Sequence, residues 1–459
     1  MARKQTRPNR DNTQSQPAKS EPLRPARQPA KESRPGKVTR PVKDKPAADT
    51  RPTEVTFAGL LKPLIAKATR PQDLANVQSS PLAHLDYPEE LRIKDQALAQ
   101  FWKHFQLPGQ PEPIISSPKP RHYKTTSKRK TILRGNTLYL LLKDRKLRAQ
   151  EKLCEESPLE PQEHGRIFAF LQKKISEPAF KLVAGHLNYL IIRGSYKEHC
   201  VIFNVDALNG PLVRKLKIIT EHLQKLSSKI TAAYIYMAPD ESDYYLEDRQ
   251  PSDLMQFKKL FGKSDLVVSY HQCRYSYHPT SFSKDNEAMV PKLLAVTKEL
   301  LAPKSGEYLL DLYCGYGLFS HFLAPGYKQV LGVDVEGPSI RAAIANKRFN
   351  PGSGKARFLA HRITERNVEE IPFPAHHAPE SIILDPPRHG PQDNVIAELA
   401  LRNPRQVLLI HCGVDQTTSS IKQWKQCGYQ VTRIIPLDMF PGSANLEVLI
   451  LFTASKMQD

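Results

Sequence analysis

After Ser281 the sequence alternates between short apolar runs and helical or turn-rich stretches, and this alternation constrains the fold more than any other feature. The runs predict strands at Tyr308–Tyr313, Gln329–Asp334, Ser381–Asp385, Gln406–Cys412, Gln430–Ile435 and Glu447–Phe452. Neighbouring parallel strands need a long crossover connection, usually a helix, so this order favours a doubly wound, mostly parallel sheet. We therefore predict an α/β domain over residues 281–459.

The sequence upstream of this domain divides into two regions. Residues 57–280 are predicted to form an α+β region, with elements at Asp86–Gln106 (helix), Thr131–Leu142 (strand), Phe180–Arg193 and Glu198–Val205 (strands), Pro211–Leu226 (helix) and Ile230–Met237 (strand). Residues 1–56 contain no aromatic side chain and are rich in Pro, Lys and Arg. Such a segment buries too little apolar surface to offset its ordering entropy, so we expect a disordered basic tail.

The charge of the chain points to a polyanionic partner. The formal net charge is +20, and residues 1–51 hold 14 basic and 5 acidic residues, so the rest of the chain is also basic. Nucleic acid is the partner that such an excess favours. The tail is either an arm that contacts phosphates or a solubilising extension, and its composition does not separate the two.

Composition also narrows the class and the compartment. No apolar run approaches the ~18 residues of a membrane span, and the N-terminal residues form neither a secretory signal nor an amphipathic presequence. The 6 cysteines are scattered without C-x-x-C spacing, so we expect no metal cluster and no disulfide framework. We expect a cytoplasmic, monomeric protein with reduced thiols.

A glycine-rich turn follows the first predicted strand of the α/β domain. It reads Asp311-Leu312-Tyr313-Cys314-Gly315-Tyr316-Gly317, and Asp334 ends the next strand. Glycines at a strand–helix turn let a ligand approach the backbone, and an acid on the next strand can accept hydrogen bonds from ribose. The plain alternative is a tight turn. Because the third glycine of the dinucleotide fingerprint is absent, the pattern favours S-adenosylmethionine (SAM) over NAD.

Three more groups of residues lie at predicted strand ends. Asp385-Pro386-Pro387-Arg388 follows one strand, where a rigid loop could present the Asp and Arg side chains to a crevice, or could simply end the strand with a surface salt bridge. Cys412, preceded by His411, ends another strand and is either a nucleophile or a small buried hydrophobe. Glu447, which begins the last strand, is either a general base or an exposed acid.

These four pieces, in this order and spacing, resemble the RNA uracil-C5 methyltransferase family, over roughly residues 80–455. Its DLYCGxGxF, DPPR, strand-end Cys and D-x-x-P…Glu motifs match Asp311–Phe319, Asp385–Arg388, Cys412 and Asp438–Glu447. The resemblance implies a Rossmann-like class I SAM methyltransferase domain. It further implies RNA (rRNA or tRNA) as substrate and SAM as cofactor.

The resemblance also implies roles for individual residues. Cys412 would be the nucleophile and Glu447 the base. The cofactor-binding residues that it implies are Asp311, Tyr313, Gly315, Gly317, Asp334, Asp385 and Lys284. Those implied to bind substrate are Arg388, Lys124, Lys128 and Arg129.

The chain departs from the family pattern at several positions. Lys284 stands where the SFFQxN segment has Gln, Gly413 follows the nucleophile where the family has Asn, and Asn445 replaces a His. Residues 77–81, Val-Gln-Ser-Ser-Pro, lie where many members carry iron–sulfur cysteines, so we expect no cluster.

The implied reaction is methylation of uracil C5 after addition of the Cys412 thiolate to C6, with Glu447 removing the C5 proton. The product is 5-methyluridine. The departures leave a second hypothesis, a non-catalytic RNA-binding relative that assists folding or assembly. A SAM enzyme acting on another base is a third.

Overall fold

The computed structural model describes residues 55–70, 80–142, 153–238, 257–350, 352–372, 378–392 and 394–455. All of them belong to one compact unit, Glu54–Asp459. The predicted disordered tail falls almost wholly outside the described residues, and so do positions 77–79 of the segment compared with the iron–sulfur cysteines.

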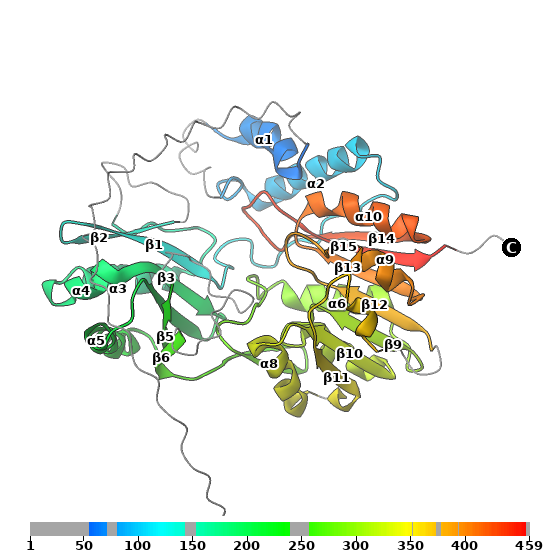
Figure 1. The fold of residues 1–459 in the computed structure, drawn as a ribbon. Coiled ribbons are helices and arrows are strands. Elements are labelled where there is room, and N and C mark those ends of the chain that lie inside the picture. The colour runs from blue at the N-terminus through cyan, green and yellow to red at the C-terminus, as the bar shows by residue number, and fades with distance from the viewer. Residues whose placement is uncertain are drawn as a thin grey trace, which may run out of the picture. The chain divides into compact units, whose positions relative to one another are not determined.

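A seven-stranded sheet forms the C-terminal part of this unit, with strand order β11-β10-β9-β12-β13-β15-β14 (Figure 1). Its strands are β9 Tyr308–Leu312, β10 Gln329–Asp334, β11 Ala356–Ala360, β12 Glu380–Leu384, β13 Gln406–His411, β14 Tyr429–Leu437 and β15 Glu447–Ala454. The first five are parallel to one another, whereas β15 is antiparallel to both β13 and β14. The predicted doubly wound, mostly parallel sheet is confirmed.

Helices cover both faces of this sheet. They are α6 Val290–Leu301, α7 Leu318–Leu323, α8 Pro338–Asn346, α9 Val395–Ala400 and α10 Thr417–Gln426. Successive side chains of a strand point to opposite faces, so Leu309 packs in the core with α6 and α7 while Leu310 packs in the core with α9 and α10. Strands buried on both faces explain the continuous apolar runs in the sequence.

A six-stranded sheet, of order β2-β1-β3-β4-β5-β6, is formed from the middle of the chain. Its strands are β1 Ser127–Arg134, β2 Thr137–Leu141, β3 Leu187–Gly194, β4 His199–Val205, β5 Ile230–Met237 and β6 Phe257–Gly262. The helices α3 Gln162–Ile175, α4 Lys181–His186 and α5 Gly210–Leu226 lie on one face (Figure 1), where they share a core with it. The other face packs with the hairpin β7 Leu266–Tyr270 and β8 Cys273–Tyr277 and with α6 and α7.

Two local predictions in this region were wrong. The single strand expected at Thr131–Leu142 is a hairpin of β1 and β2, whose turn contains Gly135 at φ 59°. The strand expected at Phe180–Arg193 is helix α4 followed by β3. The apolar run Leu190–Ile192 holds the strand, whereas Lys181–His186, with one β-branched residue, forms a helical turn.

The N-terminal helices pack on the C-terminal sheet. Helix α1, Phe57–Ala68, and helix α2, Tyr87–His104, share a core with β9, β12 and β13. Helix α2 agrees with the predicted helix at Asp86–Gln106. It carries acidic residues in its first turn and basic residues in its last, which complements the helix dipole. The domain boundary predicted at residue 281 remains a prediction. Side chains of segment 57–280 contribute to all three hydrophobic cores.

A buried polar network attaches α2 to the turn that precedes β15. Lys94 Nζ lies 2.9 Å from Glu90 Oε1 and 2.8 Å from Asp438 Oδ1, and all three side chains are fully buried. Tyr87 donates to Asp438 Oδ2 at 3.0 Å, and Arg121 pairs with Glu90 at 2.9 Å. Buried charges are tolerated only when paired, so this network ties the helix to the turn firmly.

Each helix in the described part of the chain is too short or too polar to cross a membrane.

Replacement of Lys94 tests the network. In Lys94→Met the Asp438 carboxylate keeps only the Tyr87 hydroxyl, and loss of one partner from a buried ion pair costs about 3–5 kcal/mol. We expect the free energy of unfolding, measured by urea titration, to fall by about that amount. The matched control is Arg92→Met, because Arg92 pairs with Glu89 on the exposed side of the same helix. Equal stability of the two variants would contradict the assignment.

Candidate active site

The residues predicted at strand ends meet at one edge of the seven-stranded sheet. Asp334 ends β10, Asp385 follows β12 and Cys412 follows β13, all at carboxyl ends of parallel strands. Strand β15 runs antiparallel to β13 and pairs Val448 with His411, so its first residue, Glu447, is at the level of Cys412. The antiparallel strand thus delivers an acid to the edge where open α/β sheets bind ligands.

The glycine-rich turn after β9 has an unusual backbone. Tyr313, Gly315 and Gly317 have φ of 62°, 56° and 83°. The Gly315 N–H donates to Asp334 Oδ2 at 2.6 Å, which joins the turn to the end of β10. A Cβ on Gly317 would lie 2.8 Å from a carbon of the His321 ring, so only glycine fits at this position.

Two observations fit a nucleoside cofactor at this turn. A Cβ built on Gly315 meets nothing within 4 Å, so the backbone faces open space there. Asp311 is fully buried; its Oδ2 accepts from Ser320, while its Oδ1 has no hydrogen-bond partner. Burial raises the pKa of Asp311 to about 7, and the neighbouring Asp385 adds to the rise. A buried acceptor beside an open glycine turn suits the hydroxyl and amino groups of SAM.

Lys284 lies between two carboxylates of this edge. Its Nζ is 2.9 Å from Asp385 Oδ2 and 3.1 Å from Glu447 Oε1, and its side chain is 7% exposed. Burial alone lowers a lysine pKa, but Asp385 and Glu447 together raise the pKa of Lys284 above its ordinary value. Burial also raises the pKa of Glu447, and Lys284 opposes that rise.

Cys412 is partly buried and its thiol faces polar groups. The nearest are the amide atoms of Gln416, with Oε1 at 4.0 Å and Nε2 at 3.9 Å from Sγ. Asn445 donates to the Cys412 carbonyl at 2.7 Å and so holds the backbone that carries the thiol. Burial raises the Cys412 pKa, while Gln416 and Lys284 lower it.

His411 is hydrogen-bonded to helix α10. It is buried, its Nε2 lies 3.0 Å from Ser420 Oγ in α10, and burial lowers its pKa to about 3. Its ring is directed to Ser420 of α10, and Gln416, whose amide lies near the Cys412 thiol, is also a neighbour of His411.

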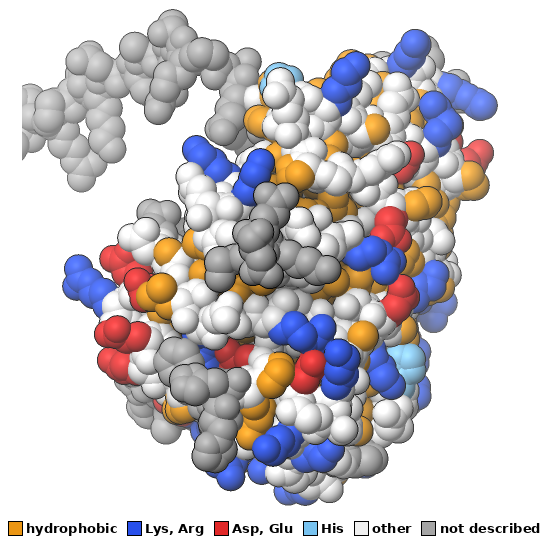
Figure 2. Space-filling view, turned by 90° about the vertical axis from the view of Figure 1, so that its right-hand side faces the viewer, with side chains coloured by type: hydrophobic (Ala, Val, Ile, Leu, Met, Phe, Trp, Pro, Cys, Tyr) orange, Lys and Arg blue, Asp and Glu red, His pale blue; other side chains and the backbone are white. Residues whose placement is uncertain are grey.

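The cations predicted to bind substrate are in different environments. Arg388 is exposed directly after β12, and Lys124 and Lys128 are half-buried. Arg129 is buried, pairs with Glu160 at 2.6 Å and lies 4.5 Å from the centre of the Phe168 ring. A guanidinium enclosed in this way cannot reach a phosphate. The prediction that Arg129 binds substrate was therefore wrong. The face in Figure 2 carries Lys and Arg side chains at several separate places, with acidic ones between them.

Two neighbours of the site were not singled out as functional from the sequence. Gln416, four residues after Cys412, lies in the short 3-10 turn before α10. In a helical turn, residues four apart lie on the same side, which brings the Gln416 amide near the Cys412 thiol. Phe282, two residues before Lys284, is 56% exposed. The sequence alone does not reveal that Phe282 is exposed while Lys284, two residues later, is buried.

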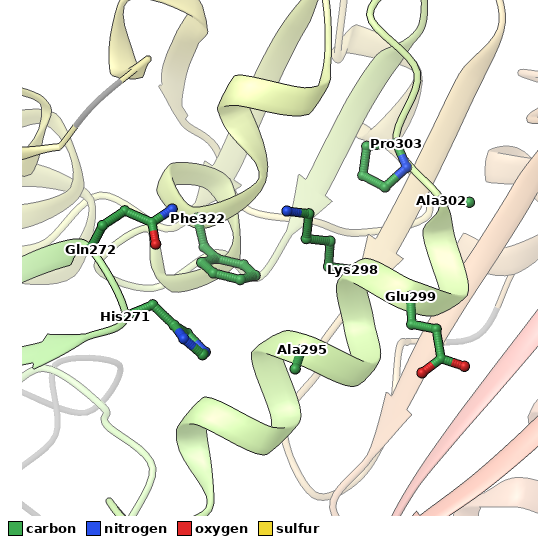
Figure 3. A pocket seen from close by; sticks show the side chains of 8 residues that line it. All are labelled: His271, Gln272, Ala295, Lys298, Glu299, Ala302, Pro303 and Phe322. Carbon is green, nitrogen blue, oxygen red and sulfur yellow. The ribbon is translucent and has the colours of Figure 1, made fainter.

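A cavity of about 670 Å³ lies elsewhere, between α6, α7 and the β7–β8 turn. In Figure 3 the side chains of His271 and Lys298 point toward Phe322. None of the strand-end residues lines this cavity, so we do not place the reaction there. Among the described residues no cluster of His, Cys, Asp and Glu could hold a metal ion.

Comparisons with known proteins show the family of this chain. The model of the tRNA (uracil-5-)-methyltransferase family matches residues 86–455. An uncharacterized RNA methyltransferase of Nanoarchaeum equitans is 24% identical over 82% of this chain and 78% of its own length. The 23S rRNA (uracil(1939)-C(5))-methyltransferase RlmD of Vibrio campbellii is 29% identical over 52% of each chain.

Among solved structures, the Pyrococcus abyssi tRNA (uracil-54, C5)-methyltransferase in complex with S-adenosyl-L-homocysteine superposes with a TM-score of 0.61. It is 22% identical and the match covers 82% of this chain and 86% of that one, which shows a shared fold. The family description specifies methyl transfer and gives no support to the non-catalytic alternative. The chain belongs to the tRNA (uracil-5-)-methyltransferase family and is a SAM-dependent RNA methyltransferase that acts on carbon 5 of uracil.

Proposed function

We propose that this chain forms 5-methyluridine in a structured rRNA or tRNA, with Cys412 as nucleophile and Glu447 as base. The observation that carries the proposal is the convergence of Cys412, Asp385, Lys284 and Glu447 at one sheet edge beside the glycine turn. The names of RlmD and of the P. abyssi enzyme specify 23S rRNA and tRNA, and we take these two RNA classes as the candidate substrates. We further propose a cytoplasmic monomer.

The chemistry follows from the weak nucleophilicity of uracil C5. Addition of the Cys412 thiolate to C6 makes C5 electron-rich, and bound SAM supplies the methyl group that C5 takes up. Glu447 then accepts the C5 proton, the C5–C6 double bond reforms, and the C6–S bond breaks to restore the thiolate.

We assign the remaining predicted residues to binding. Asp311, Tyr313, Gly315, Gly317 and Asp334 would hold the cofactor, because they form the open turn and its buried acceptor.

Asp385, with Lys284, would face both the cofactor and the base. Arg388, Lys124 and Lys128 would meet RNA, and the exposed ring of Phe282 would stack on an unstacked base. The uridine must leave its helix to reach the site, which favours a loop or an opened stem.

Gly315→Ala tests the cofactor site. The new methyl group has space in the protein but would enter the region proposed for the ligand, so we expect at least about tenfold weaker binding of S-adenosylhomocysteine by titration calorimetry. Gly135→Ala is the matched control, because Gly135 has φ 59° and equally open surroundings in the β1–β2 turn. Equal affinity of the two variants for S-adenosylhomocysteine would show that the glycine turn does not contact the cofactor.

Cys412→Ala tests the nucleophile. With labelled SAM and unmodified rRNA and tRNA transcripts, we expect 5-methyluridine from the wild type and none from the variant, which should still bind S-adenosylhomocysteine. Cys427→Ala, a change of the same kind at another partly exposed cysteine, should retain activity. Label in a nucleoside other than 5-methyluridine would overturn the proposed product.

Glu447→Gln tests the base. The glutamine cannot accept the C5 proton, so the methylated RNA should remain attached to Cys412 and appear as a slow-migrating covalent species on a denaturing gel. Release should fall by about 10²–10⁴-fold, the usual contribution of a general base. Glu299→Gln, on the exposed side of α6, is the control. Rapid release from Glu447→Gln would assign the base to another residue.

A further inference from the structure

Lys284 is a cation at a place where the family motif has a neutral glutamine. Its ammonium group contacts both oxygens of Asp385, at 2.9 and 3.0 Å, and one oxygen of Glu447, at 3.1 Å. These side chains come from three separate segments, the stretch before α6, the end of β12 and the start of β15. The two N–H groups of a glutamine amide could donate to these carboxylates, but the amide is neutral and could not offset a negative charge.

The charge balance of this group depends on Lys284. Two carboxylates and one ammonium leave a single net negative charge in a buried site, which suits the positive sulfonium of SAM. Without the ammonium, burial and the like charge of the neighbouring Asp385 would both favour the protonated form of Glu447. Glu447, which is fully buried, would be the acid most affected.

The two oxygens of Glu447 are in different situations. Oε1 accepts from Lys284, whereas Oε2 is buried and has no hydrogen-bond partner. An ionised carboxylate held by one oxygen leaves the other available to take a proton. An unpartnered buried oxygen costs stability, so its presence calls for an explanation, and a role as proton acceptor supplies one.

We propose that Lys284 is a positioning residue for proton removal, holding Glu447 ionised by its Oε1 and leaving Oε2 to accept the C5 proton. The inference rests on the proposed function. In the step, the C5–H electron pair forms the C5–C6 double bond, the C6–S bond breaks toward Cys412, and the proton on Glu447 later passes to water.

The groups that face Glu447 and Cys412 determine the expected pH dependence. Lys284 and Asp385 act on Glu447; the same two groups, with Glu447 and Gln416, act on Cys412. Lys284→Gln therefore raises the pKa of both the base and the thiol. A base must be deprotonated to act, so the rate falls as the pH drops through its pKa, and a higher pKa moves this fall to higher pH.

The experiment measures release of methylated RNA from the covalent species in single turnover, between about pH 6 and 9. The probes are unmodified transcripts and labelled SAM. For Lys284→Gln we expect release at neutral pH to be slowed at least about tenfold, with the covalent species accumulating and the rate recovering at high pH. Lys284→Arg keeps the charge, so its acidic limb should stay at the wild-type position even if its rate is lower.

A double variant isolates the residue through which Lys284 acts. If it acts on release through Glu447, Lys284→Gln combined with Glu447→Gln should release RNA no more slowly than Glu447→Gln alone. Lys292→Gln is the matched control, because Lys292 donates to the Ser116 carbonyl outside the site and its replacement should leave the profile unchanged.

Several outcomes would overturn the inference. Wild-type release rates for Lys284→Gln at every pH would do so, and a faster enzyme would mean that the lysine obstructs the site. Should Lys284→Gln fail to fold, judged by its circular dichroism spectrum and thermal unfolding transition, the Arg variant decides, because an acidic limb at higher pH than in the wild type would contradict the proposal. Absence of methyl transfer by the wild type would instead refute the proposed function, and the inference would fall with it.

Discussion

The pairing of β9 between β10 and β12 is the constraint on which the site depends. Both neighbours are parallel to β9, so three carboxyl ends meet at one edge, and β13 adds a fourth. Antiparallel β15 then brings the start of a strand to the same edge. The cofactor turn, the nucleophile and the base therefore come together through backbone hydrogen bonds, before any side chain of the site contributes.

Buried charge organises what the sheet brings together. The Lys94 network attaches α2 to the turn after Asp438, and this turn leads directly to Glu447. The Lys284 group then joins the start of β15 to the end of β12. In both, one lysine lies between two acids and contacts each of them, so its removal leaves a buried carboxylate without its cation. Rigid support of this kind keeps a base within hydrogen-bonding reach of a reacting carbon.

Strands that are buried on both faces could be predicted from the sequence, whereas several other elements, such as helix α3, could not. The strands β9, β10, β12, β13, β14 and β15 lie close to their predicted positions, because burial on both faces leaves a continuous apolar run. Edge strand β11 went unpredicted since it is only partly buried, and α1, with a proline inside it, was also not predicted. The family could be inferred from the sequence because its motifs are short, lie at strand ends and follow one another in a fixed order and spacing.

The sequence by itself determined the fold class, the family and the set of chemical groups at the strand ends, because these depend on local pattern and order. The tertiary structure decided how each group is used. It enclosed Arg129 with Glu160, turned His411 toward Ser420, and placed Lys284 between Asp385 and Glu447. Partners so distant in sequence are chosen by packing and by the need to pair every buried charge, and neither is visible in a residue's own neighbourhood of the chain.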